Sequence, residues 1–523
     1  MTPIDCLAKL RLAQPDLPLH GVAATRQIEH ALQAGLPPQA LMRRAGLSVA
    51  RLALALAPDA ERIWVACGPG NNGGDGFEAA AMLQLAGKQV RVTALGNAAS
   101  RPADAAIALR RAQDAGVHIE ARLDESGVAG AGLAIDALVG LGGRPLRAGE
   151  PDGELARTLR AFNAQPVPRL SIDLPSGLDA ECGTVATVAA EASDTLSLLT
   201  LMPGLFTAQG RDHAGRVWFD DLGAAVTGVS LPAAAWLGGG EAAACLHAAP
   251  RRHVQHKGSF GDLLVVGGAA GMAGAALLAA RAALRAGAGR VYACLFDGAA
   301  PAHDLNWPEL MLSRDHWRTP GVMATATAVV GCGGGEAVAA TLPQFLSAAA
   351  RLVLDSDALN AVAADSSLQT LLRARAGRGL QTVLTPHPLE AARLVGLLDA
   401  SAIQAHRIER AQALAETFRC VVLLKGSGSV LAAPGLAPCI NGSGNARLAS
   451  AGTGDVLAGW LGGLWSAYGT DGSVRCLQRL AQAACWLHGR AAEQPASMHR
   501  SAAREGLLHA PLRASELIER LGR

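Results

Sequence analysis

Short apolar runs alternate with longer segments of helical periodicity along both halves of the chain. In the first half, RIWVACG at 62–68 precedes the helical pattern GFEAAAMLQLAG at 76–87 and a second apolar run, QVRVTAL, at 89–95. Short apolar runs separated by helical segments are typical of strands in a parallel sheet that helices cover on both faces. We therefore expect an α/β fold in which strands and helices alternate and helices cover both faces of the sheet.

The second half starts the same alternation again with different motifs. Segment 262–295 predicts a strand, a glycine-rich loop, a long helix and a strand, and four further apolar runs follow between 328 and 434. Between the halves, the stretch 223–252 is rich in Ala, Gly and Pro and has no clear period, which is typical of a linker. We predict two domains, residues 1–228 and residues 229–523.

Composition supports a globular protein with a large core, because 50% of the 523 residues are hydrophobic and 17% are charged. The net charge of +2 comes without a basic cluster with interleaved aromatics, so a nucleic-acid partner is not expected. Ten cysteines show no metal-ligand or redox spacing, and those in apolar runs, such as Cys67, Cys294, Cys332 and Cys420, are expected to be buried reduced thiols. No run reaches the roughly 18 apolar residues that span a bilayer, so we expect a cytoplasmic protein without a membrane partner.

The glycine-rich stretch CGPGNNGGDGFEAA at 67–80 joins a predicted strand to a predicted helix. Its glycines permit close backbone approach, Asp75 is expected to open the helix whose N–H groups face an anion, and Asn72 offers a carbonyl oxygen. A Walker A lysine and the G-x-G-x-x-G spacing are both missing, so the stretch differs from the common nucleotide loops. A tight turn with Asp75 as the helix cap remains an alternative.

Two further aspartates, Asp136 and Asp173, end the next apolar runs, and Ser176 follows three residues after Asp173. Because ligands in parallel sheets bind at the carboxyl ends of the strands, Asn72, Asp136 and Ser176 can converge as oxygen ligands of an alkali or alkaline-earth cation. Asp173 would then be available as a general acid or base. Each aspartate taken singly could instead make a local Asx turn or helix cap.

In the second half, Gly452-Thr453-Gly454-Asp455 precedes an apolar helical pattern. The N–H groups of such a turn form an anion hole, and Asp455 is placed to take a proton from a hydroxyl group that is being phosphorylated. Lys425 in LLKGSGSV suits a nucleotide, and His387 in TPHPLE follows another strand, where it could act on a ligand or be a structural histidine. Asp357 in VLDSDALN is expected to be a helix N-cap.

The first half resembles the NAD(P)H-hydrate epimerase domain in LMRRAG, CGPGNNGGDGF, IDALVGLGGRPL and IDLPSGLDAECG, across roughly residues 20–225. The resemblance implies a Rossmann-like three-layer sandwich that interconverts the R and S epimers at C6 of hydrated NAD(P)H. It assigns K⁺ to Asn72, Asp136 and Ser176, and catalysis and substrate contact to Asp173. The remaining substrate contacts would be Asn71, Asn72, Gly73, Gly74, Asp75, Gly140, Leu141, Gly142, Gly143, Arg144, Pro145 and Leu146.

Three positions depart from that family's pattern. Arg43 replaces the usual Glu in LMRRAG, and Glu29 replaces the usual Asp of the first helix. Met202 replaces the usual Lys before PGL, which removes a cation that we expect near the substrate side of the sheet.

The second half resembles the ADP/ATP-dependent NAD(P)H-hydrate dehydratase, a ribokinase-like α/β fold, across roughly residues 250–520. The stretches VVGCGGG, VLDSDALN, TPHPLEAARL, LLKGSGSV and SGNARLASAGTGDVLAG carry the resemblance, with Cys332 for Pro, Ser356 for Ala, Leu389 for Gly and Thr453 for Ser as departures. It assigns Asp455 as the base in contact with substrate. The other substrate contacts would be Ala275, Gly335 and His387, and the AMP part of the nucleotide would contact Lys425, Gly426, Ser427, Gly428, Ser429 and Gly454.

Together the two resemblances imply a fused metabolite-repair enzyme, both isomerase and lyase, acting on hydrated NADH and NADPH. The expected cofactors are K⁺ and Mg²⁺ with ADP as co-substrate, and a homo-oligomer is expected. Phosphorylation of the C6 hydroxyl followed by loss of phosphate would return NAD(P)H with AMP. Two alternatives remain open: a kinase of a small vitamin precursor, and a first half that is an inactive binding module.

Overall fold

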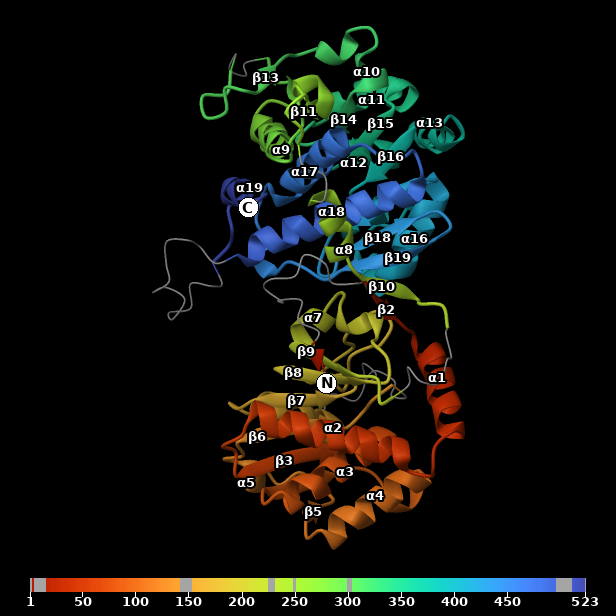
Figure 1. Ribbon diagram of the computed structural model, residues 1–523, viewed down its shortest axis with the longest axis vertical. Helices are drawn as coiled ribbons and strands as arrows, with labels where there is room; N and C mark the ends of the chain where they lie inside the picture. Colours follow the sequence, from red (N-terminus) through yellow and green to blue (C-terminus); the bar gives the residue numbers. More distant parts are fainter. Residues whose placement is uncertain are drawn as a thin grey trace. The chain divides into compact units, whose positions relative to one another are not determined.

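The computed structural model describes residues 2–3, 16–141, 153–223, 231–247, 251–298, 303–494 and 510–522, and we restrict structural statements to these ranges. The chain forms two compact units, one containing residues 18–234 and the other residues 235–523 (Figure 1). Each unit also includes a short piece of the N-terminal segment. The predicted domain boundary at 228/229 lies outside the described residues. No helix within the described ranges is long and apolar enough to cross a membrane.

The first unit is built on an eight-stranded sheet whose neighbours run parallel, except for the antiparallel pair at one edge. Its strand order is β1-β9-β8-β7-β6-β3-β4-β5. In that order the strands are Thr2–Pro3, Arg216–Asp220, Asp194–Leu198, Arg169–Ile172, Leu133–Ala137, Arg62–Cys67, Gln89–Ala94 and His118–Glu120.

Helices cover both faces of this sheet. Strand residues alternate between the two faces, so that Ile63 and Val65 pack with α2, α3 and α4, whereas Trp64 and Ala66 pack toward α5 and α6. These helices are Ala40–Leu56, Asn71–Leu85, Ala103–Asp114, Glu125–Val128 and Glu154–Asn163, and the unit also contains α1 (Val22–Ala34) and α7 (Gly210–His213). The predicted three-layer sandwich is confirmed.

The second unit has an eleven-stranded sheet in the order β13-β12-β11-β14-β15-β16-β17-β18-β19-β10-β2. The strands from β13 to β17 are parallel, and β18 is antiparallel to both of its neighbours. In sheet order they are Met311–Leu312, Arg290–Leu295, Asp262–Gly267, Thr327–Val330, Arg351–Leu354, Gln381–Leu384, Val421–Leu424, Val430–Ala433, Leu436–Asn441, Ala235–Gly238 and Leu17–Leu19. The single apolar run at 420–434 is therefore a hairpin, β17 and β18.

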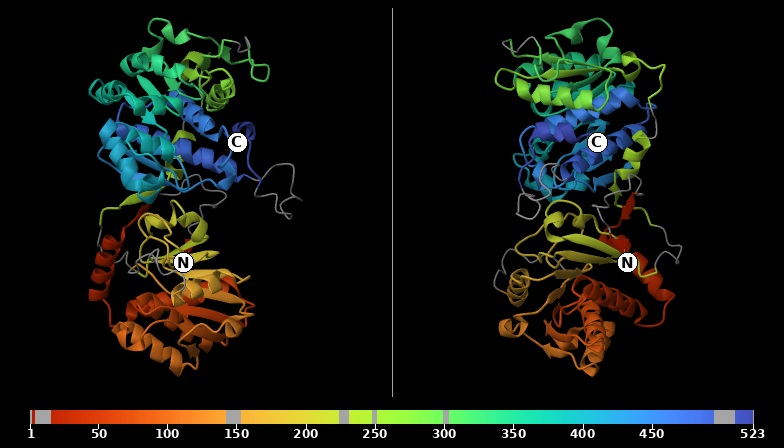
Figure 2. Two further views of the ribbon diagram at one scale, coloured as in Figure 1. Left: turned by 180° about the vertical axis from the view of Figure 1, so that it is seen from behind. Right: turned by 60° about the vertical axis from the view of Figure 1, so that its left-hand side comes forward.

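This sheet is also sandwiched between helices, as the predicted ribokinase-like α/β architecture requires (Figures 1 and 2). One face packs on α9 (Ala273–Arg285), α17 (Thr453–Tyr468), α18 (Val474–Glu493) and α19 (Ala514–Arg520). The opposite side carries α11 (Ala337–Ala348), α13 (Ser366–Gly377) and α16 (Arg407–Phe418). The remaining helices are α8 (Gly240–His247), α10 (Val322–Thr325), α12 (Asp357–Ala364), α14 (Pro388–Leu394) and α15 (Ser401–Ala405).

The cores of both units hold unpaired cysteines. Cys67, Cys294, Cys332 and Cys420 are buried and free, as the sequence predicts. Burial raises the pKa of Cys294 and Cys420 to about 12, so both remain neutral thiols.

The glycine-rich stretch after β3 is helical, which corrects the expectation that Asp75 opens the helix. Helix α3 begins at Asn71 with Gly70 as its cap, so Asp75 lies in the second turn. The glycines there allow close packing: a Cβ on Gly73 would lie 2.0 Å from the Gly68 carbonyl oxygen, and one on Gly76 would lie 2.5 Å from Ala137 Cβ. Their absent side chains let α3 lie directly on the strand ends.

The variant Gly73→Ala should destabilise the first unit, because the added methyl group cannot avoid the Gly68 backbone. We expect a loss of about 1–3 kcal/mol in the free energy of unfolding, measured by denaturant titration. Gly35→Ala is the control, since its Cβ would meet only the Leu32 carbonyl oxygen, at 3.8 Å. Equal stability of the two variants would contradict this account of the glycines.

Candidate functional site

Each unit has a point where its strand order reverses. In the first sheet β3 lies between β6 and β4, and in the second sheet β11 lies between β12 and β14. Ligands of doubly wound sheets bind at the carboxyl ends of the strands at such a point, where successive connections leave on opposite faces. Some of the predicted residues lie there, because α3 and Asp136 belong to the first reversal and Ala275 and Gly335 to the second, whereas His387 and Lys425 follow the more distant strands β16 and β17.

The first reversal carries a cavity of about 610 Å³. Of the predicted substrate contacts, it is lined by Asn71, Asn72, Asp75, Gly140, Leu141 and Asp173, whereas Gly73 and Gly74 are buried and do not line it. Residues Gly142, Gly143, Arg144, Pro145 and Leu146 lie outside the described part of the chain. The sequence analysis missed the wall that α1 supplies, namely Thr25, Arg26, Glu29 and Gln33.

Four acidic residues line this cavity, namely Glu29, Asp75, Asp104 and Asp173. Burial raises the pKa of Asp173 to about 7, although hydrogen bonds from the Leu198 and Leu141 backbones oppose the rise. Burial, and then the charges of Asp173 and Glu29, raise the pKa of Asp75 well above its usual range. A carboxyl group that titrates near neutrality can both give and accept a proton, so Asp173 has the property of a general acid or base.

Asp136 is fully engaged by hydrogen bonds. Its carboxylate accepts from Ser176 Oγ (2.6 Å), Ser176 N (2.9 Å), Ser171 Oγ (2.9 Å) and Leu138 N (3.1 Å), which fills about four acceptor positions. The structure thus joins Asp136 to Ser176 as predicted and adds Ser171, which the sequence analysis missed. The Asn72 amide is different, because its buried Oδ1 and Nδ2 have no hydrogen-bond partner among the described residues.

The three departures from the epimerase pattern lie in different surroundings. Glu29 is on the cavity wall, and Arg43 is exposed on α2. Met202 is fully buried, with Sδ 3.9 Å from Thr25 Oγ1, and is not on the cavity wall. The expectation that this replacement changes the substrate side of the sheet is therefore corrected, because its side chain packs behind α1.

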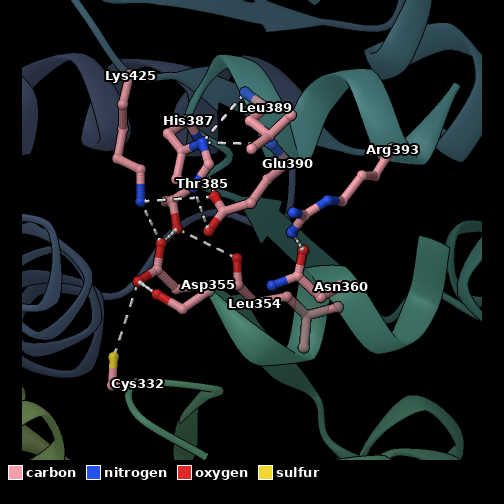
Figure 3. Close-up of polar contacts among 11 residues, drawn as sticks. Cys332, Leu354, Asp355, Asn360, Thr385, His387, Leu389, Glu390, Arg393 and Lys425 are labelled. Carbon is pink, nitrogen blue, oxygen red and sulfur yellow. Dashed lines mark hydrogen bonds and ion pairs between the residues drawn. The ribbon is translucent and has the colours of Figure 1, made fainter. Parts of the chain in front are cut away.

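In the second unit, Lys425 reaches from the end of β17 to the end of β15 (Figure 3). Its Nζ lies 2.7 Å from Asp355 Oδ1 and 3.9 Å from Glu390 Oε2, and Thr385 Oγ1 donates to the same Asp355 oxygen at 2.7 Å. Burial lowers the pKa of Lys425, but the charges of Asp355 and Glu390 outweigh it, so the pKa is raised overall. The ammonium group is therefore held charged at one defined place.

Asp455 lies in the first turn of α17, whose cap is Gly452 with a φ of +85°. One carboxylate oxygen of Asp455, one of Asp355 and the Cys332 Sγ lie within 4.8 Å of one another. Burial, helped by the charge of Asp355 and opposed by Cys332 and Lys425, raises the pKa of Asp455 to about 6. A Cβ on Gly454 would lie 3.5 Å from Lys425 Nζ, so the predicted base and the predicted nucleotide contacts adjoin.

His387 caps α14. Its Nδ1 accepts from the backbone N–H groups of Leu389 (3.1 Å) and Glu390 (3.3 Å), and the Glu390 carboxylate accepts from His387 N at 2.8 Å (Figure 3). This reciprocal arrangement is a capping box, so the histidine has a structural role at the strand end. The predicted contact of His387 with substrate stays a prediction, for which its half-exposed ring is placed at the carboxyl end of β16.

The expectation that Asp357 caps a helix is wrong. Ser356 is the N-cap of α12, and Asp357 Oδ2 instead accepts from Gly335 N at 2.8 Å. This bond holds the loop after β14, where Gly335 has a φ of +55°. A Cβ on Gly333 in the same loop would lie 2.9 Å from Ala275 Cβ, so the two predicted contacts Ala275 and Gly335 belong to one small region. The sequence alone could not indicate that the Asp357 carboxylate bonds to a different loop.

Two doubly wound α/β units, each with buried aspartates and glycine-rich turns where its strand order reverses, define a two-domain enzyme of small-molecule metabolism. Residues 38–204 match a family model described as YjeF-related protein N-terminus, and residues 263–510 match one described as NAD(P)H-hydrate dehydratase. The chain belongs to the family of bifunctional NAD(P)H-hydrate repair enzymes, which confirms the resemblance found in its motifs.

Individual relatives are similar over nearly the whole chain. The bifunctional NAD(P)H-hydrate repair enzyme Nnr of Escherichia coli K12 is 34% identical over 476 residues, which cover 88% of this chain and 85% of that protein. The Leishmania braziliensis enzyme is 32% identical over 531 residues, covering 92% and 88%. A crystal structure of the ADP/ATP-dependent NAD(P)H-hydrate dehydratase from Bacillus subtilis, co-crystallised with ATP and Mg²⁺, is 27% identical, with a TM-score of 0.43, and covers 54% of this chain and 95% of that one.

The raised pKa of Asp173 predicts a specific dependence of stability on pH. Between an ordinary carboxyl pKa of 3.8 and about 7, the folded state keeps a proton that the unfolded state has released. The Asp173 contribution to stability therefore declines as pH rises through this range and is constant above it. The variant Asp173→Asn should remove this decline, and asparagine is suitable because it tolerates the φ of +68° at this position.

The measurement is denaturant unfolding of both proteins at several pH values, with a signal that reports the unfolding of the first unit. The stability of wild type minus that of the variant should fall between about pH 4 and pH 7, so that the variant gains relative stability. Parallel stability profiles would show that Asp173 does not hold a proton in the folded state.

Proposed function

We propose that this chain repairs hydrated NADH and NADPH in two steps. The first unit epimerises the R and S hydrates, and the second unit dehydrates the S hydrate with ADP, which yields NAD(P)H, AMP and phosphate. The observation that carries the proposal is that each unit holds a buried aspartate that titrates close to neutrality, Asp173 with a pKa of about 7 and Asp455 with a pKa of about 6, at the side of its sheet where the parallel strands end. The enzyme would therefore be both an isomerase and a lyase.

In the first unit, Asp173 is the acid or base at C6. Its carboxyl group lines the cavity and titrates near pH 7, so it can pass a proton to and from the hydrate while that carbon is inverted. The charge of Glu29 on the same wall favours a protonated Asp173 in the resting enzyme. Asn71, Asn72, Gly140 and Leu141 would surround the substrate.

A K⁺ ion at Asn72, Asp136 and Ser176 is part of the proposal. The support is the Asn72 amide, whose buried Oδ1 has no donor among the described residues and is a suitable oxygen ligand. Asp136 is a less direct ligand for K⁺, because hydrogen bonds already fill the acceptor positions of its carboxylate. Its contribution would require the Ser176 hydroxyl group, 2.6 Å away, to turn its hydrogen elsewhere. When bound, the ion would supply positive charge near the substrate.

In the second unit, Asp455 would take the proton of the C6 hydroxyl group as its oxygen attacks the terminal phosphate of ADP. Lys425 and the first-turn N–H groups of α17 would hold the transferred phosphoryl group, and the short distance between Gly454 and Lys425 Nζ supports this. The ring nitrogen's lone pair can then expel phosphate from C6, and loss of a proton from C5 to the departing phosphate or to water restores the C5=C6 double bond of the dihydronicotinamide. Mg²⁺ would neutralise charge on the diphosphate, and carboxylate oxygens of Asp355 and Asp455 are ligands of the type it prefers.

Three finer points rest on the family resemblance and are proposed with it. ADP is proposed in preference to ATP as the phosphoryl donor. The chain is also proposed to form a homo-oligomer. A cytoplasmic location is proposed because the pool of NADH, NADPH and ADP on which the enzyme would act is present there.

The direct test supplies mixed-epimer NADH hydrate with ADP and Mg²⁺ and follows the absorbance of NADH. We expect conversion of the whole mixture, faster than spontaneous epimerisation allows. A fast phase limited to the S epimer would show that the first unit is an inactive binding module. A phosphorylated vitamin precursor formed without any recovery of NADH would replace the proposal with the kinase alternative.

Matched amide substitutions should separate the two activities. Asp455→Asn should lower dehydration of pure S hydrate by about 10²-fold or more, because the base is lost while the shape is kept. Asp173→Asn should leave that reaction unchanged and slow only the use of the R epimer. Normal dehydration by the Asp455→Asn variant would contradict the assignment of the base.

A further inference from the structure

The turn between β17 and β18, residues Lys425–Ser429, rests on a buried arginine that the motifs do not include. Arg407, the first residue of α16, has only 1% of its surface exposed. Its Nη1 donates to Gln404 Oε1 at 2.7 Å, and its Nη2 donates to the carbonyl oxygens of Lys425 (3.1 Å), Leu424 (3.4 Å) and Gly428 (3.5 Å). One guanidinium group thus contacts the turn at its start and near its end.

Two further hydrogen bonds hold the turn in its conformation. Ser429 Oγ donates to the Gly426 carbonyl oxygen at 3.1 Å, and Asn441 N donates to the Ser429 carbonyl oxygen at 2.8 Å. The described peptide bonds are trans, so each C=O points opposite to the N–H of the same peptide unit. The N–H groups of Gly426 and Ser429 therefore point away from Arg407.

The opposite side of the turn faces solvent, since Gly426 and Ser427 are exposed. Backbone N–H groups gathered on one side of a tight turn form a concavity that binds anions. Arg407 thus engages carbonyl oxygens on one side of the turn, and the N–H groups of Gly426 and Ser429 lie on the other side, where a phosphate can approach.

The fit between the turn and the arginine is close. Gly426 has a φ of +139°, and a Cβ there would lie 2.8 Å from both Nη1 and Nη2. Only glycine fits that conformation and that spacing. The planar guanidinium, with five N–H donors in a rigid fork, can bond several carbonyl oxygens at once, whereas a lysine ammonium is a single point of charge.

We infer that Arg407 is a positioning residue for the nucleotide, which shapes the Lys425–Ser429 turn so that its N–H groups face the phosphate, and this inference rests on the proposed function. Burial lowers the pKa of Arg407 to about 10, so it stays charged at neutral pH. Its positive charge beneath the turn adds to the attraction for phosphate.

The chain offers a matched control in Arg375. This arginine is also 1% exposed and donates to the carbonyl oxygens of Phe345, Leu346, Ala349 and Gln381. Burial lowers its pKa to about 10 as well. Its partners lie next to the starts of β15 and β16, the edge of the sheet opposite the strand ends that carry the site. It therefore has the same chemistry without the proposed role.

The experiment compares Arg407→Lys with Arg375→Lys by calorimetric titration of each full-length protein with ADP. Both variants should lower the melting temperature, because each removes several buried hydrogen bonds. The Kd for ADP should rise about tenfold or more only in Arg407→Lys, since one or two lost contacts to the turn correspond to that factor. With hydrate supplied, the KM for ADP should rise more than kcat falls.

The outcomes distinguish this inference from the proposed function. Wild-type affinity for ADP in Arg407→Lys, or an equal loss in both variants, would overturn the inference and leave the function intact. If wild type binds neither ADP nor ATP, the function fails and the inference fails with it. Should Arg407→Lys not fold, Gln404→Leu decides, because Gln404 is exposed yet orients Nη1. A several-fold higher Kd supports the inference, and an unchanged Kd overturns it.

Discussion

The burial of carboxyl groups at the ends of parallel strands is the constraint on which both sites depend. A buried carboxylate is costly unless hydrogen bonds or a cation compensate its charge. The buried aspartates of this protein differ in the number and kind of these partners. Asp136 accepts four hydrogen bonds, and Asp355 is paired with Lys425 and Thr385. Burial nevertheless raises the pKa of Asp136, and it raises the pKa of Asp173 to about 7 and that of Asp455 to about 6. Asp173 and Asp455 therefore titrate close enough to neutrality to transfer protons.

Glycine has two distinct roles in this chain, although both appear as similar Gly-rich motifs. In α3, Gly73 and Gly76 permit a helix to lie against the strand ends, where any side chain would clash. In the turn after β17, Gly426 adopts a positive φ over a guanidinium group. The first use brings a helix N-terminus close to the cavity, and the second exposes backbone N–H groups. Both prepare a surface for a ligand, but only the second forms a loop.

Much of the fold could be predicted from the sequence, because short apolar runs and helical periodicity report burial directly. The runs at 62–68 and 89–95 are β3 and β4, and the second half repeats the alternation as predicted. The candidate sites were also largely predictable, since residues that follow parallel strands meet at one edge of the sheet. Prediction failed where a partner is distant along the chain: α1 forms one cavity wall, Asp357 bonds to Gly335, and Arg407 bonds to the Lys425–Ser429 turn.

By itself, the sequence determined the two α/β units, the motifs at their strand ends and the family, because these depend on local pattern and on the order of residues. Only the tertiary structure decided which carboxyl groups keep a proton, since that depends on desolvation and on neighbours such as Glu29 beside Asp173. It also decided that the Asn-Asn-Gly-Gly stretch is the start of a helix rather than a loop, because Gly73 lies against the Gly68 backbone and Gly74 lies against Met42 and Ala105 of the neighbouring helices.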